Sequence, residues 1–300
     1  REWANERVQW GSPIGHHAAI AHKISMMASN VFAMEAMTLM TAALVDRKET
    51  DIRIEAAMCK MWCTEAAWRI VDETMAARGG RGYETADSSK ARGEDPIAVE
   101  RFMRDCRINM IFEGSSEIMR LFIAREALDP HLTIAGGVLN PRASMGQKAS
   151  AGMKALGYYA KWYPGLLLPF GSAPSNMHSM LAGHAAFAAK TSRRLARTLF
   201  HAMGKYGPKL ELQQLLVGRI VDIGTEIFAI ACVCARAQSM FRAGEHPDQT
   251  LKLADYFCRE SRLRIARHFN GIARNNDQSG YKIARNVLEG EYAWLEDGIV

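Results

Sequence analysis

Apolar residues recur at intervals of three and four along most of the chain, a spacing that places them on one face of an α-helix. In the first half this pattern predicts helices over residues 16–44, 52–77, 97–110 and from Ser115 or Ser116 to 128. The second helix is expected to stop at the glycines that begin with Gly79. Residues 83–95 are polar and are predicted to form a loop, and no stretch alternates as a β-strand does. The first half is therefore predicted to be all α.

The period is lost between residues 133 and 148, where three glycines and a proline gather, so this segment is predicted to be a linker. Helical spacing then returns over residues 149–162, 176–203, 208–242, 248–269 and 279–296. We therefore expect an all-α chain with one helical bundle over residues 1–132 and a second over 149–300, joined by the linker at 133–148.

Composition narrows the class of protein. Hydrophobic residues make up 48% of the chain and charged residues 23%, which is enough to bury a core and typical of a soluble globular protein. No uninterrupted apolar stretch approaches the roughly 18 to 20 residues of a membrane-spanning helix, so none is expected to cross a bilayer. The chain begins at Arg1 without an initiator methionine, and we expect it to start inside a longer protein.

The charge is unevenly distributed. Residues 1–150 hold 19 basic and 20 acidic side chains, whereas residues 151–300 hold 19 and 12. A basic half can face phosphates, anionic lipid or acidic partners, and it can equally be a solvated surface. The six cysteines lack the spacing of a zinc site and are interpreted as reduced intracellular thiols. Cys59 and Cys63 lie on one helix face, but no second pair is near them in sequence, so no metal is predicted.

A carboxylate between two predicted helices is the strongest candidate for chemistry. Glu113 follows Ile111 and Phe112, which would desolvate it and favour its protonated form, and Gly114 allows close approach of a substrate. A carboxylate in such surroundings can act as a base near neutral pH. A helix-capping acid is the commoner role for an isolated glutamate in this position.

Two further stretches contain candidate binding residues. Arg78-Gly79-Gly80-Arg81-Gly82-Tyr83 combines arginines with exposed N–H groups at a helix end, which could hold an anion or form only a helix C-cap. Arg7-Val8-Gln9-Trp10-Gly11-Ser12-Pro13-Ile14 offers a cation, an amide and an aromatic face, and is equally consistent with an ordinary loop before a helix.

Together and in this order, the stretches at Arg7, Gly79 and Glu113 resemble the acyl-CoA dehydrogenase family over residues 1 to about 132. The resemblance implies the C-terminal four-helix bundle of that family, which assembles into an oligomer and binds FAD across a subunit interface. It implies that Glu113 is the base that removes the α-proton of an acyl-CoA thioester and that Gly114 contacts the substrate. The implied FAD contacts are Arg7, Gln9, Trp10, Gly79, Gly80, Ser115, Ser116 and Glu117.

The sequence departs from the family pattern in two places. Ala76 stands where the family commonly has a glutamine before the double glycine, and Ser115 stands where a threonine is usual. The first change puts one amide contact to FAD in doubt. The N-terminal helical and middle β domains that family members place before this region are not in this sequence, so the resemblance implies a fragment, a chain completed by a partner or a helical remnant without activity.

The second half resembles the extra helical domain of very-long-chain and related bacterial dehydrogenases, an extension associated with membrane attachment. An aromatic cluster at residues 158–163 and an arginine series fit that association, although aromatics commonly pack a bundle core. The arginines are Arg259, Arg262, Arg264, Arg267 and Arg274.

The resemblance therefore implies the C-terminal part of an FAD-dependent enzyme that desaturates a fatty acyl-CoA and passes electrons to an electron-transfer flavoprotein. It further implies a homo-oligomer, a dimer or tetramer, with possible peripheral membrane contact and no nucleic-acid partner. The expected location is the cytoplasm or the inner membrane face, on the matrix side in a mitochondrion. The alternative is a non-catalytic helical module for oligomerisation or membrane docking.

Overall fold

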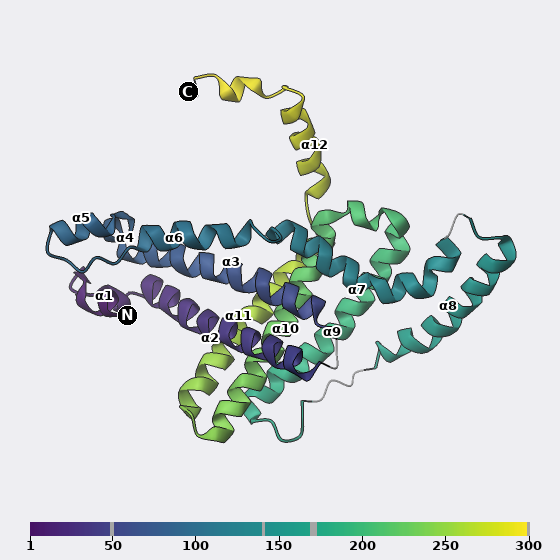
Figure 1. Ribbon diagram of the computed structural model, residues 1–300, viewed down its shortest axis with the longest axis horizontal. Helices are drawn as coiled ribbons and strands as arrows, with labels where there is room; N and C mark the ends of the chain where they lie inside the picture. Colours follow the sequence, from purple (N-terminus) through teal and green to yellow (C-terminus); the bar gives the residue numbers. More distant parts are fainter. Residues whose placement is uncertain (49–50, 140–141, 169–172, 299–300) are drawn as a thin grey trace.

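The computed structural model describes residues 1–48, 51–139, 142–168 and 173–298, and these ranges are almost wholly helical (Figure 1). The α-helices are α1 (Glu2–Glu6), α2 (Ala18–Arg47), α3 (Arg53–Arg78), α4 (Gly80–Tyr83), α5 (Ala86–Ala91), α6 (Val99–Arg107), α7 (Ser116–Leu139), α8 (Met145–Gly165), α9 (Ser179–Tyr206), α10 (Gln214–Ala243), α11 (Pro247–Ala273) and α12 (Asp277–Leu288). Four 3-10 turns are η1 (Ile14–His16), η2 (Ile108–Met110), η3 (Gly207–Leu212) and η4 (Ala293–Glu296). The strands β1 (Val8–Gln9) and β2 (Ser12–Pro13) form one small hairpin. The predicted all-α fold is confirmed.

The prediction of an irregular linker over residues 133–148 is wrong for most of its length. Helix α7 continues to Leu139, and α8 begins at Met145, where Ser144 and Gln147 cap its first turn reciprocally. Gly137 lies where α7 and α8 approach each other, since a Cβ on it would stand 2.8 Å from the Ala151 Cβ. Of the glycines that suggested a break, Gly137 therefore permits close packing of two helices instead.

The predicted loop at residues 83–95 also contains a helix. Helix α5 begins after Thr85, whose hydroxyl oxygen accepts a hydrogen bond from the backbone N–H of Ser88 at 3.2 Å. This N-cap satisfies one of the donors that a helix start leaves open, so a polar segment with little apolar periodicity still forms a turn and a half of helix.

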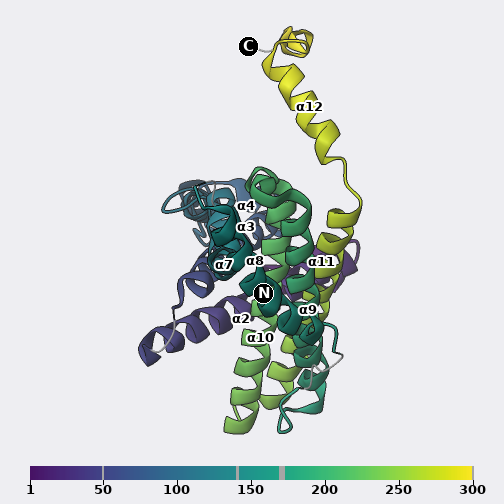
Figure 2. The same ribbon diagram turned by 90° about the vertical axis from the view of Figure 1, so that its right-hand side faces the viewer.

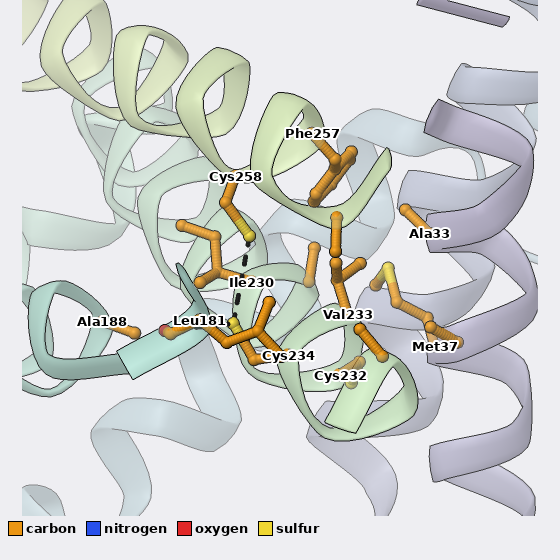
Figure 3. Packing of buried hydrophobic residues seen from close by; sticks show 14 of the residues in the cluster. Ala33, Met37, Leu181, Ala188, Ile230, Cys232, Val233, Cys234, Phe257 and Cys258 are labelled. Carbon is orange, nitrogen blue, oxygen red and sulfur yellow. Dashed lines mark hydrogen bonds between the residues drawn. The ribbon is translucent and has the colours of Figure 1, made fainter. Parts of the chain in front are cut away.

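The apolar core joins the two halves of the chain. In one cluster, Ala33 and Met37 of α2 pack with Val233 of α10 and Phe257 of α11, all four fully buried (Figure 3). A second cluster combines residues of α3 and α7 with residues of α9 and α10. The two predicted bundles therefore share their core through α10, while the domain boundaries at residues 132 and 149 stay predictions.

Helices α2 and α12 differ from the others, α2 in its hydropathy and α12 in its exposure. Of the described helices, α2 alone has the length and hydropathy of a membrane-spanning segment, and its buried side chains pack against α10 and α11. Helix α12 leaves the body of the molecule toward the C-terminus in both views (Figures 1 and 2). No residue of α12 is buried, and its start is held by the ion pair between Asp277 and Arg219, at 2.6 Å.

Candidate functional site

A cavity of about 590 Å³ brings two of the three predicted motifs together. Its lining includes Arg7, Gln9 and Trp10 from the N-terminal motif and Gly79 and Gly80 from the turn after α3. Trp10 and Gly79 are 69 positions apart in the sequence. The fold therefore assembles a single concave surface from residues that the sequence suggested separately.

The β1–β2 hairpin presents Trp10 at this cavity. Val8 pairs with Pro13 and Gln9 with Ser12, which leaves Trp10 and Gly11 as the two turn residues. Both have positive φ, 49° and 80°, as a two-residue hairpin of this type requires. A bulky residue in that region is strained, and the Trp10 side chain is nevertheless 93% exposed. Exposure and strain together indicate a residue placed for contact with a ligand or partner.

The opposite wall is the C-terminal end of α3. Trp3 donates from its indole N–H to the carbonyl oxygen of Ala77 at 3.2 Å, and the Arg78 guanidinium lies over the Trp3 ring at 4.8 Å. Gly79 has a φ of 60°, and a Cβ on Gly79 or Gly80 would meet nothing within 4 Å, so both glycines border open space. Arg78, from the stretch predicted to hold an anion, also lines the cavity, and so does Trp3, which was not predicted.

The charges in the cavity favour an anionic ligand. Within the described residues neither Arg7 nor Arg78 forms an ion pair, and the buried Nε of Arg78 has no hydrogen-bond partner there. Arg81 differs, since Glu84 and Glu94 neutralise it. The guanidiniums of Arg7 and Arg78, beside the glycine backbone and the exposed Trp10 indole, can therefore hold a phosphate group next to a planar ring.

The departure at Ala76 has a place in this geometry. Ala76 lines the cavity, so the side-chain amide expected from the family pattern would have pointed into the same region. Gly82 has a different role from its two neighbours, because a Cβ on it would stand 2.6 Å from the carbonyl oxygen of Met75. Gly82 is thus required by packing, whereas Gly79 and Gly80 face the cavity.

The third motif forms a tight turn between η2 and α7. Glu113 has a φ of 50° and Gly114 a φ of 102°. The Glu113 side chain is exposed, and so are Ile111 and Phe112, at 52% and 46%. The expectation that Ile111 and Phe112 desolvate Glu113 is therefore wrong for this chain, because both side chains are themselves about half exposed to solvent.

The start of α7 carries the remaining predicted contacts. The Ser115 hydroxyl accepts a hydrogen bond from the N–H of Ile118, and the buried Ser116 hydroxyl has no partner among the described residues. The pKa of Glu117 is lowered by hydrogen bonds from its own backbone N–H and from Ser115. This helix start can therefore stabilise negative charge.

The two sets of residues are well separated. Lys60 of α3 contacts the Glu113 turn, and Gly79, at the end of the same helix, borders the cavity. Nineteen residues of helix span about 28 Å. The structure thus brings Arg7, Gln9, Trp10, Gly79 and Gly80 together, keeps Glu113 to Glu117 together, and holds the two sets apart.

The predicted lipid-binding features of the second half have partners inside the protein. Tyr159 and Trp162 pack against His131 of α7 and Phe200 of α9, with ring centroids 4.9 to 5.9 Å apart. Arg264 pairs with buried Glu226 at 2.7 Å, and the Arg264 side chain is itself only 19% exposed. Arg259 pairs with Asp255, and Arg262 lies over Phe187. The aromatic cluster is therefore packing, and three of the five arginines are engaged.

Comparison with known proteins finds a matching family for a segment in each half of the chain. Residues 1–128 match the family described as acyl-CoA dehydrogenase, C-terminal domain, and residues 179–292 match the family described as ACAD9/ACADV, C-terminal domain. The chain is 48% identical over its whole length to the probable acyl-CoA dehydrogenase FadE10 of Mycobacterium tuberculosis, of which it covers 47%.

A second relative is the mitochondrial very long-chain specific acyl-CoA dehydrogenase of Homo sapiens, 30% identical over 98% of this chain and 43% of that protein. The chain thus spans about half the length of the curated relatives it matches. Among solved structures, an acyl-CoA dehydrogenase from Bacillus anthracis complexed with FAD aligns with a TM-score of 0.66 over 94% of this chain and 47% of that one. At 23% identity this likeness shows the fold.

Proposed function

We propose that this chain, a member of the acyl-CoA dehydrogenase family, forms the C-terminal part of an FAD-dependent enzyme that introduces a double bond into a fatty acyl-CoA. The observation that carries the proposal is the cavity in which Arg7, Gln9, Trp10, Gly79 and Gly80 meet. These residues were predicted from separate stretches to contact one cofactor, and the fold places them around one concave surface.

The residues present fit FAD. The guanidiniums of Arg7 and Arg78 and the open backbone at Gly79 suit a pyrophosphate, and the exposed Trp10 ring suits an aromatic base. Ser115, Ser116 and Glu117 at the start of α7 would hold another flavin contact. Because about 28 Å of α3 separates the two sets, we assign the cavity to the FAD of a second subunit in a homo-oligomer.

Glu113 is the proposed base. Its carboxylate would take the proton from the carbon next to the thioester carbonyl and hold it, with Gly114 beside it as the proposed substrate contact. When bound, FAD supplies the two-electron oxidant for this carbon–carbon bond. Glu113 is exposed in this chain, so the apolar surroundings that suit a base would come from the part of the enzyme that precedes Arg1.

Substitution of Glu113 by glutamine in the full-length enzyme tests the assignment. The amide preserves shape and hydrogen bonding but cannot accept the proton, so we expect FAD to stay bound and turnover to fall by about 100- to 10,000-fold. Glu291→Gln, at an exposed glutamate near the C-terminus, is the matched control and should leave turnover unchanged. Near-normal turnover in Glu113→Gln would place the base at another residue.

Partners and location follow as parts of the same proposal. The electrons would pass to an electron-transfer flavoprotein, and the enzyme would work in the cytoplasm or, in a eukaryote, the mitochondrial matrix, with peripheral contact to the inner membrane face. The alternative, a membrane-docking module without activity, is favoured by one observation. Met145, Met153 and Leu156 of α8 are 81%, 76% and 71% exposed. Their positions lie within an arc of about 80° around the helix axis, so the three side chains share one face.

A further inference from the structure

Lys60 reaches the Glu113 turn from the second turn of α3. Its Nζ donates a hydrogen bond to the carbonyl oxygen of Gly114 at 2.6 Å and another to that of Phe112 at 3.2 Å. These carbonyls flank Glu113 on both sides, 54 and 52 positions from Lys60 in the sequence. Within the described residues, no backbone N–H of the turns and loops donates to either carbonyl. A single ammonium group therefore holds both ends of the peptide segment that contains Glu113.

The backbone at this segment needs such support. Glu113, with a φ of 50°, is a side-chain-bearing residue in the left-handed region, and Gly114 follows with a φ of 102°. Glycine adopts a positive φ readily, but a residue with a side chain is strained there and persists where the surrounding structure over-determines it. The Glu113 side chain is exposed and forms no hydrogen bond or ion pair with the residues that the structure describes. Hydrogen bonds from a charged donor are stronger than those between neutral groups, so Lys60 is well suited to this role.

Lys60 is itself held by a rigid element. Ala57 and Met61, on either side of it in α3, are 4% and 2% exposed and belong to the apolar cluster shared with α7 and α10. The α7 end of the turn is tied to the same elements, because Arg120 pairs with Glu65 of α3 and Asp222 of α10, both at 2.8 Å. The position of the Glu113 backbone is thus set by the packed core through Lys60.

We propose that Lys60 is a positioning residue for Glu113: by holding the carbonyls of Phe112 and Gly114 it fixes the left-handed backbone that directs the Glu113 carboxylate. The inference rests on the proposed function, in which Glu113 is the base. Lys60 acts through the turn and touches no reacting atom. A general base must lie within hydrogen-bond reach of the proton it removes, and misplacement by about 1 Å can cost about 100-fold in rate.

The test compares Lys60→Met and Lys60→Arg in the full-length, FAD-loaded enzyme. Methionine keeps the aliphatic length without the donor, so we expect kcat to fall by about 10- to 100-fold with KM for acyl-CoA and flavin content nearly unchanged. Arginine keeps a cationic donor and should recover most of kcat. Lys252→Met, at an exposed lysine of α11, is the control and should behave as the unmodified enzyme.

A second measurement follows the turn without turnover. Amide hydrogen exchange of residues 111–119 should be about tenfold faster in Lys60→Met than in the unmodified or Lys60→Arg enzyme, because the turn opens more often. A normal kcat in Lys60→Met beside an inactive Glu113→Gln overturns the role of Lys60 and leaves the proposed function standing. Loss of flavin and of thermal stability to the same extent in Met and Arg variants overturns it as well, since Lys60 would then be structural. Turnover in Glu113→Gln contradicts the proposed function itself.

Discussion

At the scale of single residues, the informative features are groups whose conformation or protonation departs from the ordinary. Trp10 and Glu113 both carry a side chain at positive φ, and both belong to motifs proposed to contact FAD or substrate. Strain of this kind persists where the surroundings hold it, and it clusters at functional sites. The backbone geometry of these two residues thus supports the roles that their sequence context suggested.

The cysteines differ from one another in the pKa of their thiols. The Sγ atoms of Cys59 and Cys63 are 3.9 Å apart, and the hydrogen bond from the Cys63 thiol lowers the pKa of Cys59. Burial raises the pKa of Cys106, and it raises that of Cys232 to about 12. Thiolates are the reactive form, so reactivity should follow these shifts.

We therefore expect iodoacetamide at pH 7 to label Cys59 first, on the order of tenfold faster than Cys106. Peptide mass spectrometry after short exposure measures the order. The Cys63→Ala variant removes the donor and should slow labelling of Cys59, whereas Cys258, which is fully buried, should stay unlabelled until the protein unfolds. Equal labelling of Cys59 in both proteins would contradict the assigned cause.

At the scale of helices, the pair α7 and α8 shows how packing replaces intrinsic preference. Gly136 and Gly137 lower the helix propensity of α7, yet the helix runs through them. Only Gly137 lies against α8, where a Cβ would stand 2.8 Å from the Cβ of Ala151, while a Cβ on Gly136 meets nothing within 4 Å. The two adjacent glycines therefore have different structural roles.

Substitution by alanine separates these roles. Gly137→Ala forces α7 and α8 apart and should lower the free energy of unfolding by about 1 to 3 kcal/mol. Gly136→Ala adds a methyl group in open space and should be neutral or stabilise by up to about 1 kcal/mol, because alanine loses less backbone entropy. Thermal or denaturant unfolding of both variants measures the difference, and equal effects would show that Gly137 does not limit the helix contact.

At the scale of the whole molecule, the surface available to a membrane differs from the one that composition suggested. The second half has the excess of basic residues, but three arginines of α11 are engaged by other side chains of the chain: Arg259 by Asp255, Arg262 by Phe187 and Arg264 by Glu226. The aromatic cluster packs against His131 of α7 and Phe200 of α9. The exposed apolar side chains of α8 are instead the ones that could insert into a lipid interface.

We expect the chain to bind vesicles containing anionic lipid more tightly than neutral ones, with added salt weakening the binding, since the attraction reaches only about 8 Å at physiological ionic strength. Leu156→Glu should reduce vesicle binding by about tenfold, because it replaces an apolar contact by a repelled charge. Leu212→Glu, at a leucine 68% exposed in η3, is the control. Co-sedimentation measures both, and equal losses would exclude a specific role for α8.

Local sequence was sufficient for the cores of the long helices, because periodic burial and capping act over a few residues. The end of α3 followed from its glycines and the start of α7 from a capping serine, whereas α5 and the extension of α7 to Leu139 were missed. The motifs around Arg7, Gly79 and Glu113 likewise indicated the family from sequence. The tertiary structure decided what these motifs form together. It joined Arg7, Trp10 and Gly79 in one cavity and placed Lys60 on the carbonyls beside Glu113. It also gave three of the arginines and several of the aromatics that had suggested a lipid-facing surface partners within the chain. Contacts between residues 50 or more positions apart depend on how helix faces pack, and helical periodicity identifies a buried face without naming its partner.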